Sequence, residues 1–313
     1  MIEFLKQKKN IKCLVINHGI LFKNIIQELN FKLEFSFYIN TLEYNDLNQI
    51  IIFKEYDLIL VDHTGADFNN EQILYIINRL GKLNNVKTLL SFYEKIFKKI
   101  PLIHLNNDWL LNETILHEEI KKKQHLIYKR LFDLIFVLFT LPFTLPLFFI
   151  GVFMNLFFSK GPIFFKQIRV GEDGNLFNLY KIRTMKVDKF DNNYTIHNDK
   201  RITLIGKILR KSKIDELPQL YNILAGDMSL IGPRPERVDY VDDYNNKNPY
   251  YHLRHKIKPG ITGWAQVNNP KATPEDNLFK LEYDLFYIKN MSLEMDIFII
   301  IRTIKVILTF NSL

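Results

Sequence analysis

A long uncharged segment constrains the fold of this chain more than any other feature. Residues 134–158 read LIFVLFTLPFTLPLFFIGVFMNLFF and contain no Asp, Glu, Lys or Arg. A straight helix of this length would measure about 37 Å at ~1.5 Å per residue, against about 30 Å for the hydrocarbon core of a bilayer. The segment is therefore long enough to span a membrane.

Two prolines argue against a straight span. Pro142 and Pro146 lie near the middle of the segment, where each lacks a backbone donor and crowds the carbonyl four residues earlier. We therefore predict a kink or break at these prolines. The Thr144 hydroxyl lies between them and is expected to satisfy a carbonyl that the break frees.

The charges around the segment favour a helix that returns to the face it entered. Basic residues mark the cytoplasmic side of a membrane segment, and both flanks are basic. The flanking residues are Lys121, Lys122, Lys123, Lys129 and Arg130 before the segment, and Lys160, Lys166 and Arg169 after it. We predict a re-entrant, proline-broken membrane helix over 131–158. The alternative is a buried helical hairpin of a soluble protein, in which such unbroken apolarity would be unusual.

Two further segments combine apolar and basic residues. RITLIGKILRKSK places Ile202, Ile205 and Leu209 on one helical stripe, and MDIFIIIRTIKVILTF is interrupted by Arg302 and Lys305. Each segment fits a helix lying on a membrane surface, and equally a helix packed on a core with one solvated face.

The N-terminal part alternates strand-like and helix-like runs. IKCLVIN, YDLILVD and VKTLLSF read as strands, and ILFKNIIQELN and NNEQILYIINRLGKL read as helices. This alternation predicts a small Rossmann-like α/β domain over 1–120. The remainder, 121–313, is expected to form a helix-rich α+β membrane-associated domain. A dinucleotide fingerprint needs three glycines after the first strand, and only Gly19 is present. A structural or regulatory role is therefore favoured for the first domain.

The net charge and the cysteine content indicate which kinds of partner and which cellular compartment to expect. The formal charge of +8 and the pI of about 9.2 favour nucleic acid, an acidic lipid surface or a phosphorylated substrate. The single cysteine, Cys13, cannot form an internal disulfide, which is typical of a cytoplasmic location. The first residues become charged too early for a cleavable signal peptide.

The stretch SKIDELPQLYNIL contains two adjacent carboxylates, Asp215 and Glu216. Ser212 and Asp215 match the spacing of a helix capping box, Pro218 suits a first helical turn, and Gly226 suits a left-handed helix end. The pair is thus either the acidic start of a helix or a reactive site.

Cationic residues around this stretch favour a site for phosphate. In Pro233-Arg234-Pro235 the prolines hold Arg234 extended, which presents a guanidinium suited to bidentate phosphate recognition. Other cations are Arg254, His255 and Lys258 downstream, and Lys166, Arg169, Lys181 and Arg183 on a predicted hairpin turning at Asp173-Gly174. Beside a membrane segment, such a site indicates phosphate chemistry on a lipid-linked acceptor.

Together these motifs resemble a known family. KRLFD, QIRVG, YKIRTM, IDELPQLYNILAGDMSLIGPRP, KPGITGWAQVN and the region from KLEYDLFYIKN onward are similar, in order and spacing, to the bacterial sugar transferases, the monotopic polyprenyl-phosphate phosphoglycosyl transferases. The resemblance covers about 129–308. IPLIHLNNDWLL and the preceding half resemble the extra domain of the longer, exopolysaccharide-priming members. The chain departs from those members in lacking a bundle of N-terminal transmembrane helices, and in having Leu145 where serine is frequent.

The resemblance implies a reaction and a set of site residues. Such enzymes transfer a sugar 1-phosphate from a UDP-sugar to undecaprenyl phosphate and release UMP. By this likeness Asp215 is the nucleophile, Glu216 binds Mg²⁺ with Asp215 or handles a proton, and the site faces the cytoplasm at the inner membrane. The residues expected near the substrate phosphates are Arg210, Arg234, Arg254, Lys166, Arg169, Arg183 and Lys258.

Two other functions are alternatives to sugar-phosphate transfer by a monotopic enzyme. A non-catalytic membrane-anchored adaptor would use the basic face to bind anionic lipid, and a polytopic transferase would need many spans, whereas the sequence offers one. Nucleic acid is not expected as a partner, because the sequence contains no recognised binding module. The sugar, the pathway and homo-oligomerisation are left open.

Overall fold

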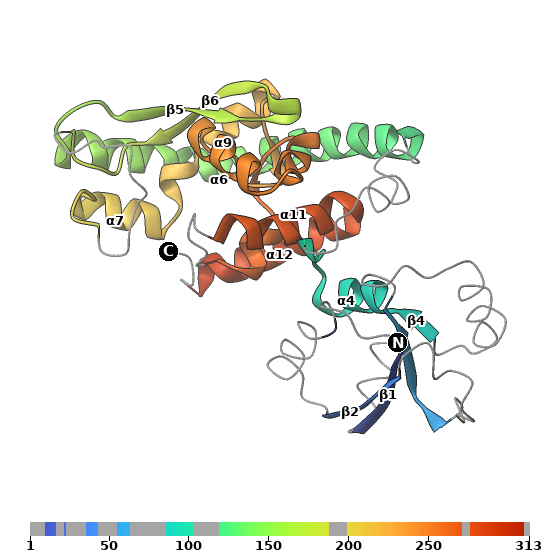
Figure 1. Cartoon of the computed structure of the whole chain (residues 1–313). Helices are drawn as coiled ribbons and strands as arrows, with labels where there is room; N and C mark the ends of the chain where they lie inside the picture. The colour runs from blue at the N-terminus through green and yellow to red at the C-terminus, as the bar shows by residue number, and fades with distance from the viewer. Residues whose placement is uncertain are drawn as a thin grey trace. The chain divides into compact units, whose positions relative to one another are not determined.

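The computed structural model describes residues 10–16, 22, 36–42, 55–62, 86–102, 119–187, 199–270 and 276–309. The chain divides into two compact units, Met1–Asn106 and Asn107–Leu313 (Figure 1). Apart from Phe22, both helices predicted for the N-terminal part lie outside the described residues, as does Gly19.

The first unit contains a parallel sheet. Its strands are β1 (Asn10–Ile16), β2 (Ser36–Leu42), β3 (Leu58–Val61) and β4 (Val86–Thr88), in the order β2-β1-β3-β4 with every neighbouring pair parallel. β1 and β3 are apolar and buried, as central strands of parallel sheets are. The predicted parallel strands are confirmed, whereas β2 was not predicted.

The third predicted strand, over VKTLLSF, is wrong after Thr88. Helix α4 (Leu89–Phe97) begins there, because the Thr88 side chain accepts a hydrogen bond from the Ser91 backbone N–H at 3.2 Å and caps the helix. The helix buries Leu89, Phe92 and Phe97 in the core of the unit. A run of apolar residues this short does not distinguish strand from helix.

In the second unit, helix α6 (Glu119–Phe158) contains the whole uncharged segment. Of the described helices, it is the one long and apolar enough to cross a membrane, over His125–Phe158. The most apolar 18 residues of this range have a mean hydropathy of 2.3, and only 11% of them are buried. The large exposure argues against the buried soluble hairpin, and it indicates a membrane-associated protein.

α6 continues as helix through Pro142 and Pro146, so the predicted break is not seen. The Thr144 hydroxyl donates to Thr140 O at 3.1 Å, not to the carbonyl of Leu138 or Pro142, which the prolines leave without a donor. The hydroxyl therefore bonds within the helix, but at a different carbonyl from the expected ones.

Two stretches of α6 pack on the rest of the unit, one on each side of residues 138–150, none of which is buried. The buried positions Lys129, Asp133, Val137, Gly151 and Asn155 recur at helical spacing. Figure 1 shows α6 running beside the β5–β6 hairpin and α7, in agreement with its contacts to both. Residues before and after the uncharged middle thus contact the same unit.

The hairpin consists of β5 (Phe164–Val170) and β6 (Leu176–Ile182), which pair antiparallel. Between them the short η4 turn (Glu172–Gly174) places Asp173 at φ 52° and Gly174 at φ 81°. The predicted turn is confirmed, since glycine adopts positive φ at little cost.

The remaining elements follow in order: α7 (Leu204–Lys211), the η6 turn (Ile214–Glu216), α8 (Gln219–Ala225), β7 (Ser229–Ile231), α9 (Val238–Lys247), the η7 helix (Tyr251–Lys256), β8 (Gly260–Thr262), α10 (Trp264–Asn268), α11 (Asn277–Lys289) and α12 (Leu293–Leu308). β7 and β8 form a short parallel pair.

Helices α7 and α12 each pack on the core, which was one of the two alternatives for these segments. α7 buries Leu209 and exposes Leu204 (81%) and Ile208 between its lysines. α12 buries Ile299 and exposes Ile301 and other apolar residues. Each helix therefore packs on the core and still presents an apolar outer face. Ile202 lies before the start of α7, outside the predicted stripe.

Candidate active site

The two carboxylates lie on a short turn between helices. Asp215 and Glu216 are in η6, between α7 and α8, and both are buried. Lys213 turns the chain into η6 with a left-handed φ of 58°. The predicted capping box is wrong, because Ser212 ends α7 and its hydroxyl donates back to Ile208 O at 2.9 Å. Gly226 ends α8 in the left-handed conformation, as predicted.

Glu216 is held by two cations. Lys181 Nζ lies 2.8 Å and Arg234 Nη2 2.7 Å from the same oxygen, Glu216 Oε1. Burial alone would raise the pKa of Glu216, but Arg234 and then Lys181 hold it well below its usual range. Glu216 is therefore ionised, and its charge is already neutralised by the protein.

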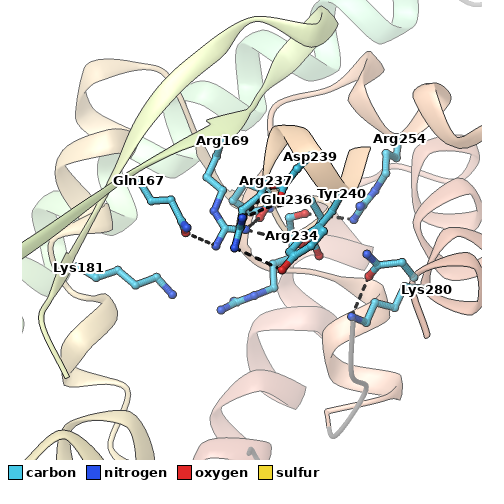
Figure 2. Close-up of polar contacts among 12 residues, drawn as sticks. Gln167, Arg169, Lys181, Arg234, Glu236, Arg237, Asp239, Tyr240, Arg254 and Lys280 are labelled. Atoms are coloured by element: carbon cyan, nitrogen blue, oxygen red, sulfur yellow. Dashed lines mark hydrogen bonds and ion pairs between the residues drawn. The ribbon is translucent and has the colours of Figure 1, made fainter. Parts of the chain in front are cut away.

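Lys181 belongs to the predicted hairpin cations, but the resemblance does not place it near the substrate phosphates. It pairs with Phe165 across the hairpin, which places it on the same face as Gln167 and Arg169. Figure 2 shows Lys181 extending from β6 toward the guanidinium of Arg234. Strand alternation could have assigned Lys181 to the inner face.

Asp215 differs from its neighbour. Its Oδ1 is buried and has no hydrogen-bond partner among the described residues. Burial, followed by the charge of Glu216, raises the pKa of Asp215 to about 6, although Lys181 and Arg210 act in the opposite direction. Asp215 is thus a mostly ionised carboxylate at neutral pH with one uncommitted oxygen.

Arg210 faces Asp215 from the last turn of α7. Its Nε donates to the Thr184 hydroxyl at 2.8 Å. Burial lowers the pKa of Arg210, and the charge of Asp215 is the largest effect that opposes this shift. Thr184 also anchors the start of α7, since its carbonyl accepts from the Thr203 N–H at 3.0 Å. Gly206 allows this close packing, because a Cβ there would lie 2.1 Å from Thr184 O.

The turn that carries the carboxylates packs directly on the uncharged segment. A Cβ on Gly151 of α6 would lie 2.5 Å from Ile214 Cγ2, and Ile214 immediately precedes Asp215. The carboxylate pair is therefore next to the part of the chain that is most compatible with lipid.

Three of the predicted phosphate ligands are engaged elsewhere. Arg254 is buried against Asp284 and Tyr251, and Arg169 donates to Gln167 and Pro235 (Figure 2). Arg183 donates to backbone carbonyls around the end of α6, including Lys160 O at 2.9 Å. Of the predicted set, Arg210 and Arg234 are the ones placed at the carboxylates.

The two predicted lysines lie away from the carboxylates. Lys166 is exposed on the outer face of β5, opposite to the face that carries Arg169. Lys258 Nζ lies 3.8 Å from where a Cβ on Gly226 would stand, beside Arg130.

The carboxylates are compatible with the Mg²⁺ predicted from the resemblance. Proteins commonly hold this ion through one or two carboxylates plus phosphate oxygens of the substrate. The uncommitted Asp215 Oδ1 suits that role. Within the described ranges no group of three or more His, Cys, Asp or Glu could hold a metal ion, so substrate oxygens and water would supply the remaining ligands.

Comparison with known proteins identifies the family. The bacterial sugar transferase family matches residues 124–310. The chain belongs to this family. The match includes most of α6, the hairpin, both carboxylates and α12, so the site described above lies within the matched region.

Named relatives cover different shares of the chain. The UDP-N-acetylgalactosamine-undecaprenyl-phosphate N-acetylgalactosaminephosphotransferase of Aeromonas hydrophila is 40% identical over 257 residues, covering 81% of this chain and 59% of that protein. The UDP-glucose:undecaprenyl-phosphate glucose-1-phosphate transferase of Klebsiella pneumoniae is 40% identical over 185 residues, covering 58% and 40%. The exopolysaccharide production protein PSS of Rhizobium leguminosarum is 39% identical over 189 residues, covering 57% and 94%. This chain thus spans about three fifths of the Aeromonas relative.

Proposed function

We propose that this transferase moves a sugar 1-phosphate from a UDP-sugar to undecaprenyl phosphate, releases UMP, and so begins the assembly of a polysaccharide or glycoconjugate. The observation that carries the proposal is the asymmetry of the carboxylates. Glu216 is neutralised by Lys181 and Arg234, whereas Asp215 keeps a buried oxygen without a partner. The names of the relatives at about 40% identity support the substrates.

The proposed reaction has two displacements at phosphorus. An oxygen of Asp215 attacks the sugar-bearing phosphate, and the bond from that phosphorus to the bridging oxygen breaks, so that UMP leaves with the bridging oxygen. An oxygen of undecaprenyl phosphate then attacks the same phosphorus and frees the carboxylate of Asp215. The product is undecaprenyl diphosphosugar, and no net proton is needed.

The cations around Asp215 suit this chemistry. Arg210 and Arg234 would bind the phosphates, since guanidinium groups match phosphate oxygens in pairs. Charge on the phosphoryl oxygens would be stabilised in a buried site where such contacts are strong. When bound, Mg²⁺ supplies further neutralisation of the diphosphate, held by Asp215 and Glu216.

We further propose that the protein is monotopic at the inner membrane, with the site on the cytoplasmic face. Residues on both sides of the uncharged middle of α6 pack on the same unit, from Lys129 to Asn155. Both ends of the helix would then stay on one side of the membrane, with the middle immersed as a re-entrant element bent at the prolines. The first unit would serve a structural or regulatory role.

The test is turnover with a panel of UDP-sugars and undecaprenyl phosphate. We expect UMP release with at least one sugar, and, without the lipid, a phosphosugar adduct on Asp215 detectable by mass spectrometry of peptides. Asp215→Asn should abolish both. Asp243→Asn, at an exposed carboxylate paired with Lys247, is the matched control and should be active. An adduct-free, fully active Asp215→Asn would overturn the nucleophile, and no turnover with any UDP-sugar would favour the lipid-binding adaptor.

A further inference from the structure

The segment that presents Arg234 is fixed through its carbonyl groups. Pro233 and Pro235 have no N–H, so these residues can be held only as acceptors. Four consecutive carbonyls each accept one hydrogen bond: Pro233 O from Gly260 N (2.9 Å), Arg234 O from Arg254 Nη2 (3.1 Å), Pro235 O from Arg169 Nη1 (3.0 Å) and Glu236 O from Val170 N (3.0 Å). The donors come from β5, η7 and β8, which lie far apart in the sequence.

Two of these four donors are arginine side chains: Arg254 is buried and Arg169 is partly buried. Arg254 is 2% exposed, and each of its three nitrogen atoms donates within the protein. Nε and Nη2 bind Asp284 Oδ2 at 3.1 and 2.8 Å, and Nη1 binds the Tyr251 hydroxyl. A buried guanidinium carries a large desolvation cost that Asp284 offsets. The Arg254 guanidinium is thus fixed by contacts other than its hydrogen bond to the Arg234 carbonyl.

Arg169 reaches the next carbonyl from the other side. Its Nη2 donates to Gln167 Oε1 at 2.6 Å, and its Nη1 lies 3.6 Å from Glu236 Oε2. In Figure 2 Arg169 descends from the hairpin and Arg254 enters from the opposite side, with Arg234 between them. The backbone of Arg234 is therefore held from two directions.

We infer that Arg254 and Arg169 are positioning residues that act on the reaction through Arg234. They fix its backbone so that Arg234 Nη2 stands 2.7 Å from Glu216 and faces the phosphates. This inference rests on the proposed function, because that function places Arg234 at the substrate. It also replaces the role suggested by the resemblance, in which Arg254 and Arg169 bind phosphate themselves.

A double-mutant cycle distinguishes positioning from direct binding. Arg254→Lys should lower kcat/KM for the UDP-sugar by at least about tenfold, since small misplacements of catalytic groups are costly. In an Arg234→Ala background the same change should cost less than about twofold, because the guanidinium that the backbone contact positions is gone. Arg183→Lys, at a buried arginine that donates to carbonyls elsewhere, should act equally in both backgrounds. Equal losses from Arg254→Lys in both backgrounds would overturn the inference.

Arg169→Lys runs the same cycle on the adjacent carbonyl if Arg254→Lys does not fold. A second readout needs no turnover: the Nε–H resonance of Arg234 in ¹⁵N-arginine-labelled protein, assigned by its loss in Arg234→Lys. It should shift in Arg254→Lys and Arg169→Lys and stay in place in Arg183→Lys. If the Arg234 resonance moves in neither Arg254→Lys nor Arg169→Lys, the inference is refuted even if the wild-type protein turns over. If the resonance shifts but the wild-type protein shows no turnover, only the proposed function is refuted.

Discussion

At the scale of single residues, two adjacent carboxylates have opposite environments. Glu216 has its pKa held low by Arg234 and Lys181, and Asp215 has its pKa raised to about 6 by burial and by Glu216. Pairs of titratable groups whose pKa values are pushed apart are typical of sites with divided roles. In the proposed reaction the neutralised Glu216 assists and the uncommitted Asp215 is the nucleophile.

This arrangement predicts the pH dependence of the reaction. The nucleophile must be ionised, so kcat/KM should fall as the pH decreases through about 6. Glu216→Gln removes the charge that raises the pKa of Asp215 and leaves Lys181 and Arg234 without their partner, and both effects lower that pKa. We expect a slower enzyme whose acidic limb lies at lower pH, measured as kcat/KM against pH. A limb that stays or moves upward would contradict the assignment, and Asp243→Asn should leave it unchanged.

The sequence could locate this pair but not divide its roles. Asp215 and Glu216 are neighbours in the chain, whereas the cations that distinguish them come from residues 35 and 18 positions away from Glu216. Arg254 illustrates the same limit. In the sequence it is one of several basic residues in a motif expected to bind phosphate, and its buried ion pair with Asp284 is seen only in the structure. Only tertiary contacts distinguish an arginine that could bind phosphate from one that holds the backbone in place.

At the scale of elements, the site depends on how α7 docks against the end of β6. Thr184 follows β6, and its side chain and carbonyl hold Arg210 and Thr203. The capping motif misled at this point because Ser212 already belongs to the end of α7, so its hydroxyl bonds backward rather than starting a new helix. Local patterns predicted the hairpin turn and the Gly226 helix end, where one residue's conformation decides the outcome.

The docking of α7 is tested at Thr184. Thr184→Val keeps the shape and removes the hydroxyl that accepts from Arg210 Nε. We expect kcat to fall about tenfold, because a charge-stabilising group is no longer oriented, with a stability loss of about 1 kcal/mol. Thr184→Ser keeps the hydroxyl and should retain most activity. Steady-state kinetics and thermal unfolding measure both, and equal activities of the two variants would refute the role of the hydroxyl.

At the scale of the whole molecule, the exposed large apolar side chains of the described residues lie, apart from Tyr38, in the second unit. α6, α7 and α12 each bury one face on that unit and expose apolar residues on another. The sequence predicted the apolar segment from its composition alone, because uncharged runs of this length are rare in soluble cores. It did not predict that α6 would remain helical across both prolines, since the cost of a missing donor depends on the surrounding packing.

The position of α6 predicts the sidedness of its ends. If the second unit lies on one side of the membrane, cysteines at Lys123 and Lys160 must be labelled from that same side, because residues beside both positions pack on that unit. In a Cys13→Ser background, a membrane-impermeant maleimide should leave Lys123→Cys and Lys160→Cys unlabelled in intact spheroplasts and label both after lysis. His252→Cys, exposed on the same unit, reports the side of the active site and should behave identically. Labelling of one end before lysis and the other only afterwards would establish a span through the bilayer and refute the monotopic arrangement.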